Sequence, residues 1–503
     1  MATTRKTPAK KAPATKTATK KAPATKAAAK KAPAKKTVTK TATKTATKKA
    51  PAKKPSPPVQ STKPTIPSVL QPGTNKTVTA PVFAELNTTP DPTKYTTPHA
   101  SDTQAYNEMD ALVKSNQFVP LPFPVASVTE PVLTLASALG PAGASTVAAI
   151  QKAGQIVFHT SGDTGATQGP KTENEVVDKL LSDFTGEAAN AVPQFFYNLG
   201  DIVYSFGEEK YYYDQFYDAY RDYPAPIFAI PGNHDGIVLP PPAGTGVPTD
   251  SLKSFLANFC TPTFTHSIDA AGISRTTMIQ PGVYFTLDAP LVRIIGLYSN
   301  MLENPGVISS TPNPKTGQPT FPQLSDAQLT FLTAALTRVK TDKFTGAVII
   351  AVHHPPYAFG TKSGSLTMLK EIDAICDSTG VWPHAFLSGH AHNYQRYTRT
   401  LGKRQTPFFV IGNGGHGLQR LNIPTTLRTP APMQAFAQPE RNDSVVLNSY
   451  DFTNYGYCRV VVTTTQLHIE YHPASDGGTT KTPNDTVTVD LATGTLTTYT
   501  PAD

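Results

Sequence analysis

Cysteine is scarce in this chain of 503 residues, which contains only Cys260, Cys376 and Cys458. Their wide and unpatterned spacing predicts neither a disulfide framework nor a cysteine-based zinc cluster. After Met1, the first fifty residues hold nothing more apolar than Ala, Pro and an isolated Val38, so they lack the apolar segment of a secretory signal. We therefore expect an intracellular protein. The Gly-x-x-x-x-Gly-Lys pattern of nucleotide-driven chemistry is also missing.

Acidic residues are absent from the first 64 positions, which carry 19 of the 45 Lys and Arg residues. The rest of the chain holds 26 basic against 36 acidic residues, so a tail of charge +19 precedes a body of charge −10. Units such as Lys10-Lys11-Ala12-Pro13-Ala14 recur along the tail, and it has no aromatic residue. Such a segment cannot offset its chain entropy by burying apolar surface, which predicts that residues 1–64 are disordered.

The composition of this tail resembles the Lys/Ala/Pro tails of histone H1-type proteins. A polycation of this kind is expected to bind polyanions such as nucleic acid, polyphosphate or an anionic membrane. Association with nucleic acid would then follow from residues 1–64. The alternative is that the tail only aids solubility or serves as a localisation signal, because blocks of like charge are often merely solvated.

Long apolar runs are rare as well. Residues 131–151 lack charge over about the length of a membrane span, but they are rich in Ala, Ser, Thr and Gly and are interrupted by Pro141. We expect packed helix and loop here and no integral membrane association, with a spanning helix as the less favoured alternative. Residues 65–150 are therefore predicted to be a linker and an N-terminal extension with a helix or two.

From residue 151 to 503 the pattern is that of an α/β domain that ends in antiparallel strands. Apolar runs at 155–158, 195–199, 226–230, 347–352 and 385–387 have the length and composition of buried strands. Two helices are predicted between them. Capping boxes of Thr172 with Glu175 and of Ser325 with Gln328 are expected to open these helices. Alternating segments at 459–471 and 486–491 predict the antiparallel strands.

Polar motifs recur where the predicted strands stop, which is where open α/β sheets place their ligand sites. One such motif alone is weak evidence, because Asp after Gly is commonly a turn residue and a lone His is commonly a satisfied polar residue. Five in order favour a functional site. They are Gly162-Asp163-Thr164-Gly165, Gly200-Asp201-Ile202-Val203-Tyr204, Gly232-Asn233-His234-Asp235, Val352-His353-His354-Pro355 and Gly389-His390-Ala391-His392.

The order and residue types of these motifs resemble the purple acid phosphatases of the calcineurin-like metallophosphoesterase superfamily. That group carries GDxG, GDxxY, GNH(D/E), VxxH and GHxH, and the fourth motif here begins with Ile350 in place of Val. The resemblance covers residues 155–420 and implies a calcineurin-like, four-layer α-β-β-α sandwich of the α/β class.

Carried over position by position, the resemblance implies two metal ions with one shared ligand. Asp201 would bridge the two ions. The first ion would be held by Asp163, Asp201, Tyr204 and His392, and the second by Asp201, Asn233, His353 and His390.

The donor types agree with this division. Two carboxylates and a phenolate suit a hard trivalent ion such as Fe(III), and a shared carboxylate, an amide and two imidazoles suit divalent Zn, Mn or Fe. Gly165 stands where commoner members of the superfamily have a histidine two residues after the first Asp, so Tyr204 would supply the missing ligand. The alternative for Tyr204 is an ordinary core tyrosine.

The resemblance implies an enzyme that hydrolyses phosphate esters with a metal-bound hydroxide, with phosphomonoesters favoured. Two ions about 3.5–4 Å apart can activate water and stabilise the attacking and leaving oxygens, so no side-chain nucleophile is required. His234 would face substrate as phosphate binder or general acid. His354 and His416 are expected beside the site, in contact with substrate or as structural residues. His159, His384, His468 and His472 have no assigned role.

Three alternatives stay open at this stage. The same fold would also serve a phosphodiesterase or a pyrophosphatase, and the loops at 236–250, 301–320 and 357–366 hold no specificity signal that separates these activities. The third alternative is a nucleic-acid-binding protein that acts mainly through residues 1–64. A complete set of seven expected ligands favours a working enzyme with an accessory tail.

Overall fold

The computed structural model describes residues 75–84, 91–96, 103–115, 117–118, 126–238, 251–310, 324–421, 427–475 and 480–501. The chain divides into a unit Met1–Pro67 and a unit Ser68–Asp503. The predicted tail at residues 1–64 lies outside the described residues. The second unit contains everything that follows.

One mixed sheet joins three parallel strands to the C-terminal part of the chain. Its three parallel strands lie within or overlap the apolar runs predicted at 155–158, 195–199 and 226–230, each of which precedes a motif. The antiparallel strands predicted at 459–471 and 486–491 extend the sheet at one edge. Within the described residues its spatial order is β18 (Thr495–Thr497), β17 (Asp485–Asp490), β16 (Gln466–Pro473), β15 (Gly456–Thr463), β3 (Gln155–Ser161), β4 (Phe196–Asn198) and β5 (Ile227–Ala229).

A second, larger sheet carries the other two motif-bearing strands at its centre, where β8, β9, β10 and β12 run parallel. Within the described residues its order is β13 (Ala431–Pro432), β14 (Asp443–Asp451), β11 (Tyr394–Leu401), β12 (Arg404–Ile411), β10 (Ala385–Ser388), β9 (Ala347–Val352), β8 (Val292–Leu297), β7 (Phe285–Ala289) and β2 (Val132–Thr134). A short pair is formed by β1 (Lys76–Thr77) and β6 (Thr265–His266).

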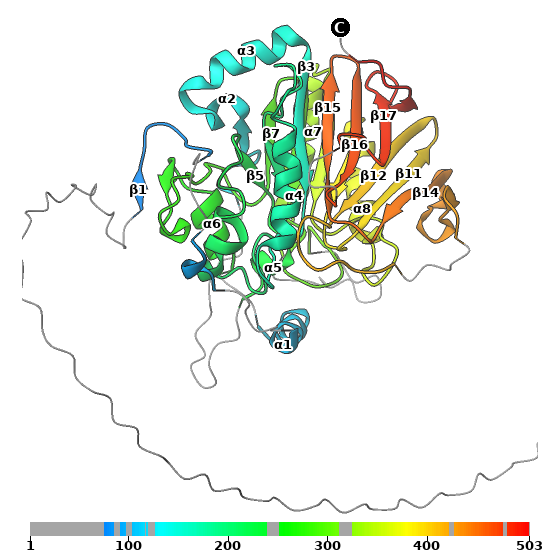
Figure 1. The fold of residues 1–503 in the computed structure, drawn as a ribbon. Helices are drawn as coiled ribbons and strands as arrows, with labels where there is room; N and C mark the ends of the chain where they lie inside the picture. The colour runs from blue at the N-terminus through cyan, green and yellow to red at the C-terminus, as the bar shows by residue number, and fades with distance from the viewer. Residues whose placement is uncertain are drawn as a thin grey trace, which may run out of the picture. The chain divides into compact units, whose positions relative to one another are not determined.

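Helices cover the outer faces of the two sheets, which gives the expected four-layer α-β-β-α sandwich. Helices α3 and α4 contact the first sheet, α7 packs on β8 of the second, and α8 packs on α7. Figure 1 shows α4 crossing the face of the strands around β3. The helices are α1 (Thr103–Lys114), α2 (Leu135–Ala138), α3 (Gly143–Ala153), α4 (Lys171–Ser182), α5 (Asn233–Gly236), α6 (Lys253–Phe259), α7 (Ala327–Thr341) and α8 (Leu366–Thr379).

The apolar core follows the same layers. One large buried cluster contains residues from both sheets and from α4, α7 and α8. A smaller, separate cluster joins α1 to the loops that carry Phe206, Ile237 and Met301. The helix from the N-terminal extension is thus anchored by its own apolar contacts.

Both predicted capping boxes are wrong. The Thr172 hydroxyl lies inside α4 and donates to the Gly415 carbonyl oxygen at 2.6 Å. The Gln328 side chain bonds the backbone of Tyr298, at 2.8 Å to its N–H and at 2.8 Å to its carbonyl. In both places the polar side chain hydrogen bonds to a backbone group far away in the sequence, and not to the backbone at the start of its own helix.

The uncharged segment 131–151 forms β2, α2 and part of α3, as packed structure was expected. Among the described residues, no helix combines the length and apolar character needed to cross a membrane. The three cysteines all lie within the described residues and are free thiols. The expectation that they form no disulfide framework is confirmed.

Candidate metal centre

The five motifs begin where β3, β4, β5, β9 and β10 end. Three of these strands belong to the first sheet and two to the second. The carboxyl ends of parallel strands meet at one edge, and here the edges of both sheets meet in space. The structure brings all seven predicted ligands together there, and all of them are buried: Asp163, Asp201, Tyr204, Asn233, His353, His390 and His392.

The Tyr204 hydroxyl is the centre of one group of donor atoms. It lies 3.1 Å from Asp163 Oδ1 and 3.1 Å from Asp201 Oδ2. His392 Nε2 is 3.4 Å from the same hydroxyl and 3.3 Å from Asp163 Oδ1. These four side chains are the first predicted ligand set.

The amide oxygen of Asn233 is the centre of the other group. It lies 3.1 Å from His353 Nε2 and 2.9 Å from His390 Nδ1. His353 Nε2 is also 3.2 Å from Asp201 Oδ2, so Asp201 takes part in both groups. Ligand atoms of Asp201, His353 and His390 lie within 4.8 Å of one another.

The residues fit a bound cation because atoms with lone pairs face one another. His353 Nδ1 lies 2.8 Å from the Leu199 carbonyl oxygen, which requires a proton on Nδ1 and leaves Nε2 of the neutral ring as an acceptor. That Nε2 faces the Asn233 and Asp201 oxygens, which are also acceptors. His392 Nδ1 likewise faces the Gly417 carbonyl at 2.9 Å. A cation between these atoms would satisfy them, and such hydrogen bonds to the far nitrogen are typical of metal-binding histidines.

Electrostatics in the centre favour positive charge. Burial lowers the pKa of His353, but the Asp201 and Asp163 carboxylates and the Leu199 carbonyl together raise it to about 9. Without an ion, Nε2 therefore carries a proton, which a bound cation would replace. Burial would raise the pKa of Asp201, yet the neighbouring His353 and His234 hold it well below its ordinary value. The pocket thus stabilises a cation next to an ionised Asp201.

The backbone bends sharply at three of the seven residues. Asp163, Asp201 and His390 have φ values of 56°, 55° and 69°, in the left-handed region that non-glycine residues seldom adopt. Such conformations are maintained where surrounding structure imposes them, often at functional sites. Gly232 permits a close approach as well, because a Cβ there would lie 2.1 Å from Asp201 Oδ1.

His234 lies beside the centre and is partly exposed. Its backbone N–H donates to Asp201 Oδ1 at 2.8 Å, and its Nδ1 lies 2.8 Å from the Ser205 carbonyl oxygen. The ring packs between Tyr106 and Tyr204, with centroids 4.4 Å from each. Burial lowers the pKa of His234 to about 4, against the opposing effect of Asp201.

The two histidines expected beside the site do lie there. His354 Nδ1 lies 2.7 Å from Ser299 Oγ and its Nε2 lies 2.8 Å from the Leu302 carbonyl, so both ring nitrogens are engaged by protein. The His416 ring stacks on Tyr204 with centroids 3.7 Å apart. Burial lowers the pKa of each of these histidines to about 3.

The remaining histidines that sequence left without a role make structural contacts away from the centre. His159 contacts Asp183 and Tyr223. His384 Nδ1 accepts from the Val348 N–H. His468 and His472 both contact Glu470.

Three residues near the centre were missed by the sequence analysis. Tyr106, on α1, hydrogen bonds to Asn233 and stacks on His234. Glu303 accepts from Tyr106 and forms an ion pair with Lys362. These residues belong to the unassigned extension and to two loops without a recognisable motif, so no local signal could have found them.

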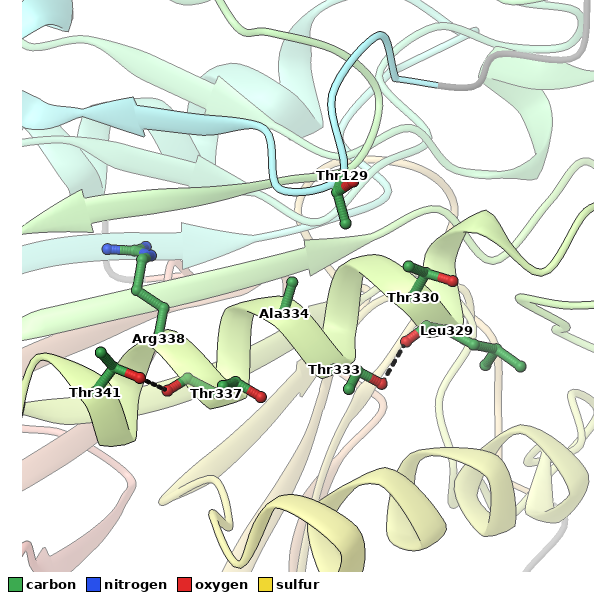
Figure 2. A pocket seen from close by; sticks show the side chains of 8 residues that line it. All are labelled: Thr129, Leu329, Thr330, Thr333, Ala334, Thr337, Arg338 and Thr341. Atoms are coloured by element: carbon green, nitrogen blue, oxygen red, sulfur yellow. Dashed lines mark hydrogen bonds between the residues drawn. The ribbon is translucent and has the colours of Figure 1, made fainter.

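A cavity of about 660 Å³ lies elsewhere, along α7 (Figure 2). It shares no residue with the metal centre and is lined mainly by threonines. Thr333 and Thr341 donate their hydroxyls to carbonyls one helical turn earlier, and Arg338 pairs with Glu130 and Asp288. The hydroxyls of Thr333 and Thr341 and the Nε and Nη1 atoms of Arg338 thus already have protein partners.

Comparison with known proteins agrees with the fold. Residues 161–394, a little under half of the chain, match the calcineurin-like phosphoesterase family model. The fold is that of a metallophosphoesterase, and the chain is a hydrolase. Members of the matched family use two metal ions, and the described residues include a group, Asp201, His353 and His390, that could hold a metal ion. The comparison with curated proteins gave no match.

Several solved structures are similar at low identity. GAP50, the anchor in the inner membrane complex of Plasmodium, is 14% identical over 66% of this chain and 87% of its own, with a TM-score of 0.39. PhoD is 12% identical over 69% of this chain and 72% of its own, with a TM-score of 0.39. A dimetal phosphatase from Danio rerio is 11% identical over 67% of this chain and 99% of its own, with a TM-score of 0.36.

Proposed function

We propose that this chain hydrolyses phosphate esters at a dinuclear centre of the purple acid phosphatase type, with phosphomonoesters as the favoured substrates. The observation that carries the proposal is the position of the Tyr204 hydroxyl, which lies between two carboxylates and a histidine nitrogen. A core tyrosine does not need three polar partners of that kind. A phenolate ligand beside two carboxylates suits Fe(III), and the Asn233 side of the centre suits a divalent ion such as Zn, Mn or Fe.

The two ions would supply Lewis-acid chemistry, which means they would withdraw charge from the phosphoryl group and generate the nucleophile from water. The protein supplies the rest. Asp201 reaches both donor groups and fixes their separation. His234 would act through Nε2, because Nδ1 is held by the Ser205 carbonyl. When the ring is protonated, Nε2–H can bind a phosphate oxygen or give its proton to the leaving group.

Preference for monoesters over diesters or pyrophosphates rests on the family resemblance. Two residues found beside the centre are relevant to this preference. Lys362 pairs with Glu303 there, and the cationic side chain suits a substrate with a doubly charged phosphate. A panel of phosphomonoesters, diesters and pyrophosphate, assayed with metal analysis, tests this part of the proposal. A diesterase activity that exceeds monoesterase activity would overturn it.

The phenolate assignment predicts colour. The purified, oxidised protein should contain two metal ions per chain including iron, and should absorb visible light through charge transfer from Tyr204 to Fe(III). Tyr204→Phe should abolish the band. Tyr457→Phe is the matched control, because its buried hydroxyl also hydrogen bonds to a carboxylate, Asp183 at 2.7 Å, away from the centre.

The measurement is visible absorption combined with metal analysis by mass spectrometry. A colourless, active wild type that carries two divalent ions would contradict the ferric assignment and leave phosphoesterase activity intact. Loss of the band in the Tyr457→Phe control would also contradict the assignment to Tyr204.

We further propose that residues 1–64 tether the enzyme to polyanions. The support is their composition, with 19 basic and no acidic residues. Nucleic acid is the polyanion tested below. The alternative of a protein that acts mainly through its tail is less well supported, because all seven ligand candidates are present and buried.

A further inference from the structure

Helix α1 lies outside the segment that matches the family and outside the five motifs, yet it reaches the metal centre. Tyr106, in the first half of this helix, accepts a hydrogen bond from Asn233 Nδ2 at 2.5 Å and donates one to Glu303 Oε2 at 2.9 Å. Its ring stacks on the His234 ring, with centroids 4.4 Å apart and planes 23° from parallel. One side chain therefore contacts a predicted ligand and the predicted catalytic histidine.

The hydroxyl of Tyr106 decides which end of the Asn233 amide faces the centre. The amide NH₂ points to the Tyr106 oxygen and lies 3.4 Å from Glu303 Oε2, so the amide oxygen points to His353 and His390. A flipped amide would place its oxygen against the Glu303 carboxylate and its NH₂ where a cation is expected. Both contacts would be repulsive, and the partners of an amide determine its orientation.

Other contacts of α1 hold Tyr106 in this position. Met109 and Val113, one and two turns further on, are buried in the small apolar cluster with Met301 and Leu302. Asp110 Oδ1 accepts the Glu303 backbone N–H at 2.9 Å. Lys362 pairs with Glu303 Oε1 on the other side, which leaves Oε2 for Tyr106. The helix and the Glu303 loop are thus fixed to each other.

We propose that Tyr106 is a positioning residue of the metal centre: its hydroxyl presents Asn233 as an oxygen donor, and its ring holds His234. The N-terminal extension is then a working part of the active site. This inference rests on the proposed function, because it assumes that Asn233 binds one of two ions. It assigns no direct contact between Tyr106 and metal.

The first test measures metal binding rather than activity. Apoprotein of the full chain is titrated with Zn²⁺ by calorimetry for wild type, Tyr106→Phe and Tyr95→Phe. We expect two sites in the wild type. Tyr106→Phe should weaken one of them by about 10–100-fold, the usual effect of losing an outer hydrogen bond to a ligand, and leave the other unchanged. Tyr95→Phe is the matched control, because its hydroxyl bonds Asp218 at 2.5 Å away from the centre and should bind like wild type.

The second test separates the hydroxyl from the ring. At saturating Zn²⁺, Tyr106→Phe keeps the stacked ring and should regain a kcat within a few-fold of wild type. Tyr106→Leu loses the ring and should stay about 10²-fold lower, because His234 loses its support. Thermal unfolding of both variants shows whether α1 remains packed.

The outcomes distinguish the inference from the function on which it rests. Wild-type protein that binds fewer than two Zn²⁺ ions, and that holds no iron when purified, would overturn the proposed function. A wild type with two sites and a Tyr106→Phe variant with the same two affinities would overturn the role of the hydroxyl alone. Equal kcat values for folded Phe and Leu variants at saturating metal would overturn the role of the ring.

Discussion

The direction in which single donor atoms point determines the chemistry available at this centre. His353 and His392 each turn one ring nitrogen to a backbone carbonyl, at Leu199 and Gly417, and the other to the carboxylates. These carbonyls fix the tautomer before any ion arrives. A histidine at either position would not be oriented as a metal ligand if its second ring nitrogen had no hydrogen-bond partner.

Asp201 and His234 lie close together but should behave differently when replaced. Asp201→Ala removes a side chain that contacts both donor groups, so it should lose metal and lower activity by orders of magnitude. His234→Ala keeps all seven ligands, so it should retain metal and slow turnover by about 10²–10⁴, the usual contribution of a general acid or base. Metal content per chain and kcat are measured on both variants.

His354→Ala is a useful third variant. Its ring nitrogens both contact protein groups, so its replacement should lower the stability of the fold more than it lowers the rate of the chemical step.

The Asp201 and His234 variants also test each other. Equal metal loss in both would show that the role assigned to His234 is wrong.

At the scale of helices and strands, buried charge joins elements that sequence cannot pair. Arg399 on β11 bonds both carboxylate oxygens of Asp373 on α8, each at 2.7 Å. Its Nε also donates to Asp443 on β14 at 2.8 Å. The side chains are 3%, 1% and 0% exposed, so these groups have no access to solvent as a substitute partner.

Arg399→Ala should therefore lower the free energy of unfolding by about 3–5 kcal/mol, because it leaves the buried Asp443 carboxylate without its cation. Asp373 would keep only the longer contacts with Arg441 at 3.6 Å and Gln438 at 3.3 Å. Denaturant unfolding followed by circular dichroism measures this change. Lys253→Ala is the control, since Lys253 pairs with Glu209 in the open, with side chains 68% and 61% exposed, and such pairs contribute little. An Arg399→Ala variant as stable as the Lys253→Ala control would contradict the assignment.

At the scale of the whole molecule, the charge is divided between two regions of opposite sign. Residues 1–64 carry +19 and the remainder −10. The tail should bind DNA by releasing counterions, with an affinity that falls steeply as salt rises and with little base preference. Deletion of residues 1–64 should abolish low-salt DNA binding and leave kcat on a small phosphate ester unchanged.

Fluorescence anisotropy with duplex DNA decides this prediction when full-length and truncated proteins are compared across a salt series. The truncated protein keeps α1 and Tyr106, so an effect on kcat would not arise from the metal centre itself. Equal binding by both forms, or no low-salt binding by the full-length form, would refute the tether and favour a role in solubility or localisation.

The sequence by itself determined the parts of this protein that depend on local order. Strand runs that end in Gly-Asp, Gly-Asn-His and Gly-His-x-His predicted the strands of the sheets. The resemblance of these motifs to a known family implied the phosphoesterase fold and the seven residues that lie together at the centre. These predictions succeeded because a buried strand and the turn after it are specified within about ten consecutive residues. The same logic predicted the antiparallel strands at the C-terminal edge.

Tertiary structure decided what depends on residues far apart in the chain. Thr172 and Gln328 have the spacing of residues in helix capping boxes. Their side chains instead hydrogen bond to the Gly415 carbonyl and to the backbone of Tyr298, which are distant in the sequence. Tyr106 lies 127 positions from Asn233, in a segment without a motif, and only packing of α1 brings the two together. Local patterns specify which atoms are available, whereas the orientation of a buried polar atom depends on whichever distant group the fold places beside it.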